Sequence, residues 1–175
     1  MMTGRWLMTA LLIGGSSAAA ADPVIVDEEG VDEEAPLRNY QVISDRLGTA
    51  GTLSAGAVSW LVADGYRMII DLRDEFDESE ANAALAEDAI YVHVPVSWPA
   101  PSADELESFL LVMAANPEKK ILVHCSANYR ASAMTYLYRV LELDTDPEEA
   151  MADVRAIWEP NMTWLSFIAR STRAR

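Results

Sequence analysis

The stretch KKILVHCSANYRAS, residues 119–132, constrains the fold more than any other part of this 175-residue chain. It opens with a run of β-branched and apolar residues, passes through a short polar segment, and continues into an apolar helical pattern from Arg130 to Leu143. This order predicts a buried strand, a loop and a helix. The first backbone N–H groups of such a helix have no partner inside it, so the loop is a candidate seat for an anion.

The only cysteine of the chain, Cys125, lies where the predicted strand ends. Unpaired N–H groups, the positive end of the helix dipole and Arg130 all favour negative charge there, which predicts a reactive thiolate. The chain has no second cysteine with which Cys125 could form an internal disulfide. The alternative is a structural cysteine, buried as a small apolar side chain.

The sequence HCSANYRAS resembles the signature loop of the cysteine-dependent phosphatases, in which His-Cys is followed by a phosphate cradle, an Arg and a Ser or Thr. The motifs ISDRLGTAGTLS, GYRMIIDLR and YVHVPVSW precede it in the order found in the phosphatase-like domain of the bacterial beta-lactamase-hydrolase-like proteins, relatives of the dual-specificity phosphatases. The resemblance covers residues 39–143. It implies a dual-specificity-phosphatase-like α/β fold without a cofactor, in which a mostly parallel central sheet of about 4–5 strands carries helices on both faces.

The resemblance also implies a role for each residue of the loop. Cys125 attacks phosphorus and forms a phosphocysteine, and Arg130 holds two phosphoryl oxygens. Ser132 stabilises the sulfur as a leaving group, and His124 orients the loop; the alternatives are a polar residue of the first helical turn and a core histidine. The remaining phosphoryl charge is held by backbone N–H groups of Ser126, Ala127, Asn128 and Tyr129.

No residue of the sequence is an obvious candidate for the general acid. The family places an Asp in the loop after the strand that here reads HVPV, but this chain has Trp98-Pro99-Ala100. Asp104 is the nearest carboxylate and is the predicted acid, although a negative charge in the first turn of a helix is also favoured by the helix dipole. Asp74, after the strand that ends in DLR, is a second carboxylate that could point into the same site. Without an acid, the enzyme would be limited to good leaving groups.

The segment between Cys125 and Arg130 is one residue shorter than in the usual phosphatase loop. This spacing also resembles the rhodanese-type sulfurtransferases, in which Cys125 would carry a persulfide. A catalytically weak anion-binding module is the third possibility. Within the loop, Asn128 stands where glycine is common, and asparagine tolerates the left-handed backbone better than most residues.

Three segments are expected along the chain. Residues 1–21 are predicted to be a cleaved signal peptide, with Arg5 before a short apolar core and a small-residue tail before Asp22. The apolar core is too short for a stable membrane span, and the alternative is an uncleaved anchor. Residues 22–38 form an acidic flexible arm, and residues 39–175 form the phosphatase-like domain. The mature protein is therefore expected to be periplasmic or secreted.

The chain is strongly acidic, with 28 Asp and Glu against 13 Lys and Arg and a net charge of −15. Such a surface repels nucleic acid and anionic membranes, which excludes both as partners. The expected partner is a phosphorylated small molecule or a phosphoprotein. Two histidines and one cysteine scattered along the sequence do not have the spacing of a zinc site, so no metal is expected.

Periodicity and cap residues predict the remaining elements. Thr52 or Ser54 is expected to cap the first helix, Ser102 and Glu105 to form a capping box, and Asp146 to cap a later helix. Strands that alternate with helices form a parallel sheet and place the loop at the carboxyl ends of the strands, where such sheets bind ligands. The predicted strands are 40–43, 47–51, 66–72, 90–96 and the run before Cys125, and the predicted helices are 53–64, 79–87, 102–116, 130–143, 146–158 and 161–170.

Overall fold

The computed structural model describes residues 37–54 and 56–173. The predicted signal peptide, 1–21, and most of the predicted acidic arm, 22–38, lie outside these residues. Leu37 is buried and forms a β-bridge with Leu53, so the folded part already includes residues before the expected boundary at 39. In the part of the chain that is described, no helix is long and apolar enough to cross a membrane.

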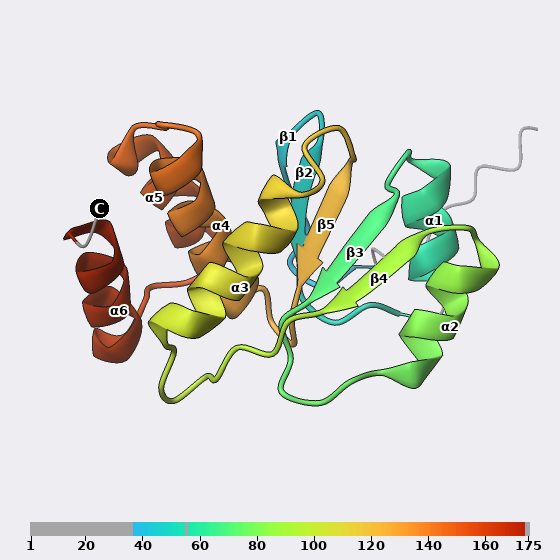
Figure 1. The fold of residues 1–175 in the computed structure, drawn as a ribbon, viewed down its shortest axis with the longest axis horizontal. Helices are drawn as coiled ribbons and strands as arrows, with labels where there is room; N and C mark the ends of the chain where they lie inside the picture. Colours follow the sequence, from blue (N-terminus) through green and yellow to red (C-terminus); the bar gives the residue numbers. More distant parts are fainter. Residues whose placement is uncertain (1–36, 55, 174–175) are drawn as a thin grey trace, which may run out of the picture. The chain divides into compact units, whose positions relative to one another are not determined.

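A sheet of five strands in the order β1-β2-β5-β3-β4 forms the middle layer of the described residues (Figure 1). Strands β2, β5, β3 and β4 are parallel to their neighbours, and β1 pairs antiparallel with β2. The mostly parallel sheet predicted from the sequence is therefore confirmed. The strands are β1 (Gln41–Ser44), β2 (Leu47–Ala50), β3 (Met68–Asp71), β4 (Ile90–His93) and β5 (Ile121–His124).

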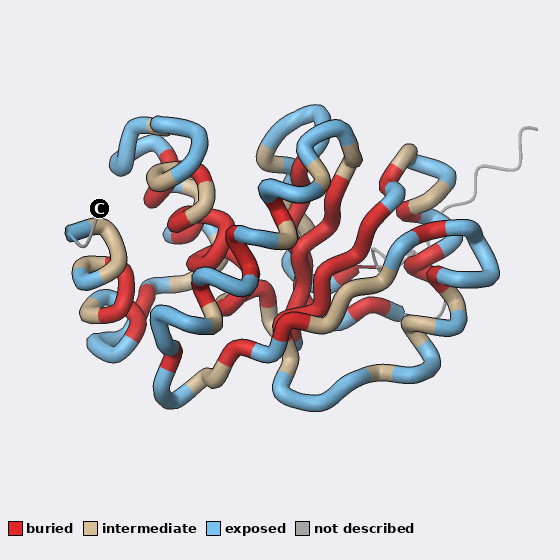
Figure 2. Tube along the Cα trace, in the orientation of Figure 1, coloured by how far each residue is buried: buried red, intermediate tan, exposed pale blue. Residues whose placement is uncertain are grey.

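Helices cover both faces of the sheet, as expected for this fold class (Figure 1). The buried side chains of each face form a separate apolar cluster, one around Tyr66 and Leu61 and a larger one around Phe109 and Trp164. Between the two clusters, β2, β3 and β5 are buried at every residue, whereas β1 and β4 are only partly buried (Figure 2). The first face carries α1 (Ala57–Ala63) and α2 (Glu78–Ala86); the second carries α3 (Ala103–Ala114), α4 (Tyr129–Glu142), α5 (Pro147–Ile157) and α6 (Met162–Arg173).

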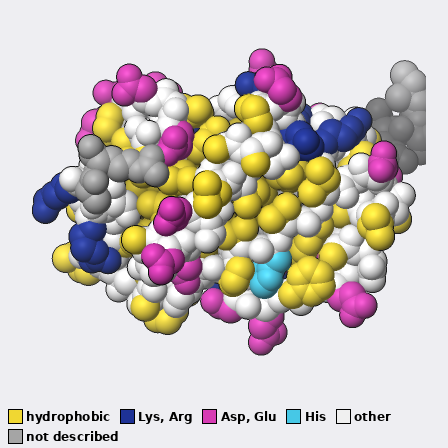
Figure 3. Space-filling model, in the orientation of Figure 1, with side chains coloured by type: hydrophobic (Ala, Val, Ile, Leu, Met, Phe, Trp, Pro, Cys, Tyr) yellow, Lys and Arg dark blue, Asp and Glu magenta, His cyan; other side chains and the backbone are white. Residues whose placement is uncertain are grey.

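The polar surface follows the acidic composition. On the face drawn in Figure 3, Asp and Glu side chains lie around the edge, and hydrophobic side chains cover the middle over α3 and β4. Strand β4 is the last strand of the sheet, and Ile90 at its start is exposed.

The predicted caps of α3 and α5 are confirmed. Ser102 and Glu105 form the reciprocal capping box of α3, and the Asp146 side chain accepts from two backbone N–H groups at the start of α5. Helix α1, in contrast, begins later than predicted, after Gly56 in the left-handed conformation. The reason is that the Thr52 hydroxyl donates to Ser126 O at 2.9 Å and does not cap the helix.

Gly48 in β2 leaves room for a hydrogen-bonded pair of tyrosines. A Cβ at this position would overlap Tyr66 Oη, which lies 2.8 Å from Tyr40 Oη. Because Tyr66 is buried, we expect Gly48→Ala to lower the free energy of unfolding by about 1–3 kcal/mol, measured by urea denaturation. Adding Tyr66→Phe removes the overlapping oxygen and should recover part of this loss; a fully additive double variant would contradict the explanation.

Candidate active site

The loop between β5 and α4 is held so that its carbonyl oxygens face outward. Ser126 O accepts from the Thr52 backbone N–H at 3.2 Å and from the Thr52 hydroxyl, and Ala127 O accepts from Asn39 Nδ2 at 3.0 Å. The C=O and N–H of one trans peptide point in opposite directions, so the N–H group of Ala127 faces away from the donors at Thr52. Together with the unpaired N–H groups at the N-terminus of α4, it forms the kind of amide surface that binds anions.

Asn128 holds the loop between β5 and α4 in this conformation. It adopts the predicted left-handed conformation, with φ 66°, immediately before α4. Its side chain is buried, and Nδ2 donates to Asn39 O at 2.7 Å and to Thr49 Oγ1 at 2.9 Å. Asn128 therefore ties the loop to β2 and supplies a backbone turn that most side chains disfavour.

Cys125 lies at the bottom of a hollow of about 460 Å³. The residue is only 1% exposed, and its backbone N–H donates to Ala50 O at 3.2 Å. We call this cavity the sulfur hollow. It is lined by Trp98, Cys125, Ser126, Ala127, Tyr129 and Arg130.

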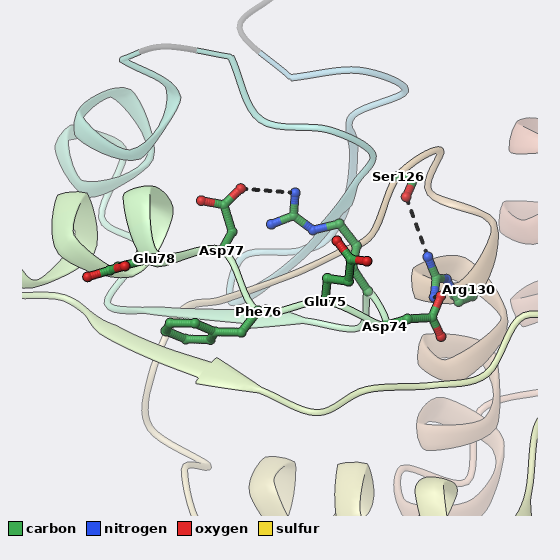
Figure 4. Close-up of a pocket in the computed structure, with 8 residues that line it drawn as sticks. Asp74, Glu75, Phe76, Asp77, Glu78, Ser126 and Arg130 are labelled. Carbon is green, nitrogen blue, oxygen red and sulfur yellow. Dashed lines mark hydrogen bonds and ion pairs between the residues drawn. The ribbon is translucent and has the colours of Figure 1, made fainter.

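Arg130, in the first turn of α4, presents its guanidinium to the same hollow while only 7% exposed. Nη1 donates to Val96 O at 2.9 Å and to Asp74 Oδ2 at 3.0 Å, and Nη2 lies 3.4 Å from Ser126 Oγ (Figure 4). These contacts fix the plane of the guanidinium. A planar group held in this way is suited to bidentate binding of a phosphate or carboxylate.

A second cavity of about 430 Å³ also borders Arg130 (Figure 4). We call it the acidic hollow, because the loop after β3 contributes four carboxylates to its wall. It shares Ser126 and Arg130 with the sulfur hollow, so the two cavities meet at the guanidinium. Its lining residues are Arg73, Asp74, Glu75, Phe76, Asp77, Glu78, Ser126 and Arg130.

Aromatic side chains form the apolar wall of the sulfur hollow. Tyr129 stacks on Trp158 with ring centroids 4.7 Å apart, and the Trp98 ring lies 5.5 Å from that of Trp164. Trp164 Nε1 also donates to Trp98 O at 3.2 Å, which fixes the loop after β4. The sequence did not place Trp98 and Tyr129 together, because no periodicity links a loop to a distant helix.

His124 lies behind the loop, in a buried polar cluster that the sequence did not reveal. Its Nε2 is 3.7 Å from Asp71 Oδ1 and 3.4 Å from Glu80 Oε2. Burial lowers the pKa of His124 to about 4 against the attraction of Asp71, so the ring is neutral at neutral pH. Asp71, Glu80 and His124 are close enough to ligate a metal ion, but Arg73 already bonds both carboxylates. A metal would have to displace that guanidinium.

Glu80 makes this cluster sensitive to pH. Burial raises its pKa to about 7, against the attraction of Arg73. A carboxyl whose pKa rises on folding stabilises the fold at acid pH, and this contribution is lost as the pH rises through about 7. The lowered pKa of His124 acts in the opposite sense, because its contribution is lost as the pH falls toward 4.

We therefore expect Glu80→Gln to remove the part of the pH dependence that belongs to Glu80. The Tm of the variant relative to the wild type should be higher at about pH 8 than at about pH 5, because only the wild type carries the buried charge at the higher pH. Thermal unfolding at both pH values measures this, with the exposed Glu78→Gln as the matched control. A constant difference between the two pH values would contradict the assignment.

The predicted loop residues are brought together, but Ser132 is not among the residues that line the sulfur hollow. Its hydroxyl donates to Tyr129 O at 3.1 Å and accepts from Trp158 Nε1 at 3.1 Å. Two positions along an α-helix correspond to a rotation of about 200°, so Ser132 and Arg130 face different sides of α4. In this structure the Ser132 hydroxyl joins α4 to the aromatic wall.

The two carboxylates considered as general acid are placed differently. Asp104 lines a third cavity, of about 610 Å³, between β4 and α3, whose lining does not include Cys125 or Arg130. Asp74 lines both that cavity and the acidic hollow, and it pairs with Arg130. Of the two, Asp74 is the one that contacts the loop machinery.

Comparison with known proteins agrees with this geometry. A family profile described as "DSP-PTPase phosphatase fused to NAD+ Kinase" matches residues 29–165. The chain belongs to this family. The DSP-PTPase domain is also 29% identical over 104 residues to the probable NAD kinase 2 of chloroplasts in Oryza sativa subsp. japonica. That alignment covers 53% of the chain and 11% of the rice protein, so the chain corresponds to a small part of that relative.

Solved structures of similar fold include further phosphatases. A putative phosphatase from Shewanella putrefaciens CN-32 is 25% identical, with a TM-score of 0.71 over 83% of this chain and 96% of that one. A mouse putative dual specificity phosphatase, solved with zinc tungstate, is 21% identical, with a TM-score of 0.66 over 83% and 93% of the two chains. The DSP-PTPase domain thus has the dual-specificity-phosphatase fold, and the resemblance to the cysteine-dependent phosphatases is confirmed at the level of family and fold.

Proposed function

We propose that this chain is a cysteine-dependent phosphatase that hydrolyses a phosphate monoester through a phosphocysteine. The observation that carries the proposal is the arrangement of the sulfur hollow, in which Cys125 and the fixed guanidinium of Arg130 line one cavity at the N-terminus of α4. Membership of the DSP-PTPase family supports the same chemistry.

The reaction proceeds in two displacements. The Cys125 thiolate attacks phosphorus, so that an S–P bond forms as the bond to the leaving oxygen breaks. Water then attacks the phosphocysteine, the S–P bond breaks, and inorganic phosphate leaves. Arg130 holds two phosphoryl oxygens, and the N–H groups of the loop stabilise the charge that spreads over the oxygens in each transition state.

The walls of the site indicate what the substrate carries beyond the phosphate. Trp98 and Tyr129 offer an apolar surface beside the sulfur, against which an organic leaving group can pack. The net charge of −15 disfavours polyanionic substrates. We therefore propose a phosphorylated small molecule or a phosphoprotein as the substrate, and no nucleic acid. The signal peptide predicted for residues 1–21 would place this activity in the periplasm or outside the cell.

The test compares two reactions of the same sulfur. The purified full chain is incubated with an aryl phosphate and, separately, with thiosulfate and a thiol acceptor. We expect release of inorganic phosphate and no turnover of thiosulfate. Thiosulfate turnover would instead support persulfide chemistry, which the short loop between Cys125 and Arg130 suggests as the second candidate. Turnover of neither substrate would leave an anion-binding module.

A further inference from the structure

The general acid of this phosphatase is missing from the loop where the family carries it. That loop reads Trp98-Pro99-Ala100, and Ala100 is exposed and has no proton to give. Asp104 lines the separate cavity beside α3. Protonation of the leaving oxygen must therefore come from another part of the molecule if the enzyme acts on poor leaving groups.

Asp74 is placed for this task by its contact with Arg130. Its Oδ2 lies 3.0 Å from Arg130 Nη1, and Arg130 also lines the sulfur hollow together with Cys125. The Asp74 side chain is 62% exposed, so the loop after β3 holds it at the mouth of the site and not in the protein interior. Asp74 lines the acidic hollow, which shares Ser126 and Arg130 with the sulfur hollow, so its carboxyl lies next to the residues that would hold the phosphoryl group.

We propose that Asp74 is the general acid of the first displacement and the general base of the second. In the first step, the electron pair of the breaking P–O bond goes to the leaving oxygen, which takes the proton of the Asp74 carboxyl. In the second step, the attacking water gives its proton to the Asp74 carboxylate as its oxygen bonds to phosphorus. The S–P electron pair returns to Cys125, and the enzyme is regenerated. This inference rests on the proposed phosphatase function.

The pairing in the free protein explains how Asp74 changes its protonation. Arg130 is the cation that Asp74 contacts, because Arg73 is bonded to Asp71, Asp77 and Glu80. A phosphoryl group that binds Arg130 replaces Asp74 as the partner of the guanidinium. It also places a second anion next to the Asp74 carboxylate. Two neighbouring anions favour protonation of one of them. Substrate binding itself thus prepares the acid.

The surroundings of Asp74 are predominantly acidic. They contain two arginines and several carboxylates, which are contributed by the loop after β3 and by the starts of α2 and α3. The titratable and charged groups that line the two cavities of Asp74 are Arg73, Glu75, Asp77, Glu78, His93, Asp104, Glu105 and Arg130.

The test compares Asp74→Asn with the wild type on two substrates of similar shape, 4-nitrophenyl phosphate and phenyl phosphate. The amide keeps the size of the side chain but has no acidic proton. We expect kcat/KM on phenyl phosphate to fall about 10²–10⁴-fold, and kcat/KM on the nitrophenyl ester, whose leaving group needs no proton, to fall less than about 10-fold. The limb of the pH profile of kcat that falls at high pH, which reports the acid in the enzyme–substrate complex, should also disappear in the variant.

The matched control is Glu75→Gln, which removes the same charge from the neighbouring residue and should leave the ratio of the two substrates unchanged. Equal losses on both substrates, with an unchanged pH profile, would make Asp74 a residue that only positions Arg130 and would overturn the inference. A selective loss in Asp104→Asn in place of Asp74→Asn would also overturn it. If the wild type itself releases no phosphate from either ester, the proposed function fails and the inference fails with it. If the wild type is active and only the Asp74 result is absent, the inference alone fails.

Discussion

Replacing Cys125 by serine should lower kcat/KM for an aryl phosphate by at least about 10⁴-fold, because the reaction loses its nucleophile. Serine differs from cysteine by one atom, so the 1% exposed position should tolerate the change without unfolding. The hydroxyl is not ionised near neutral pH and is a far weaker nucleophile than a thiolate. Steady-state phosphate release, with Tm measured on the same samples, gives the comparison.

The Cys125→Ser variant should still bind an oxyanion, and this binding provides the control for the experiment. The Ala127 amide, the N-terminus of α4 and the guanidinium of Arg130 do not depend on the sulfur. Inorganic phosphate should therefore raise the Tm of Cys125→Ser about as much as that of the wild type, by binding to the folded state alone. If the serine variant released phosphate at a rate near that of the wild type, Cys125 would not be the nucleophile.

Arg130→Lys should lower kcat/KM by about 10²–10³-fold although the charge is retained. In the structure the guanidinium is fixed by Val96 O, Asp74 and Ser126, so its two Nη atoms are presented as a plane. Lysine offers a point charge on a flexible stem and cannot bind two phosphoryl oxygens in parallel. Because the fork serves the transition state more than the ground state, most of the loss should fall on kcat.

The matched control is Arg46→Lys, the same chemical change at an exposed ion pair with Glu118. Surface pairs of this kind contribute little, so the control should retain wild-type kinetics. A similar loss in both variants would indicate a nonspecific effect. An Arg130→Lys enzyme with unchanged kcat would contradict bidentate binding by this side chain.

The part of the site that the sequence predicted best is the part built from neighbouring residues. The strand, loop and helix around Cys125, and the left-handed Asn128, follow from local rules about apolar periodicity, unpaired N–H groups and backbone preference. The capping box of Ser102 and Glu105 is equally local. Such features depend on a few consecutive residues, so a single sequence contains the information needed to predict them.

Contacts between distant segments were harder to predict. The pair of Asp74 with Arg130 joins the loop after β3 to the first turn of α4. The two segments are neighbours because β3 lies beside β5, which the sequence order does not state. The start of α1 was wrong for a related reason, since the Thr52 hydroxyl is used by the loop at Ser126. The Thr52 hydroxyl could either cap α1 or bond the loop at Ser126, and the neighbouring residues alone do not decide between these two partners.

The contacts of Ser132 are a further case of long-range information. Its hydroxyl donates to Tyr129 O and accepts from Trp158 Nε1, a residue 26 positions away, and no local pattern predicted the second bond. The role of Ser132 in stabilising the sulfur stays a prediction.

The most direct test of the central claim is to identify the covalent intermediate. The enzyme is quenched in acid during turnover of an aryl phosphate, digested, and the peptide that contains Cys125 is examined by mass spectrometry. We predict one added phosphoryl group on Cys125 in the wild type, absent from Cys125→Ser and lost once the substrate is exhausted. Continued phosphate release with an unmodified Cys125 throughout turnover, or a persulfide in place of the phosphoryl group, would contradict the account.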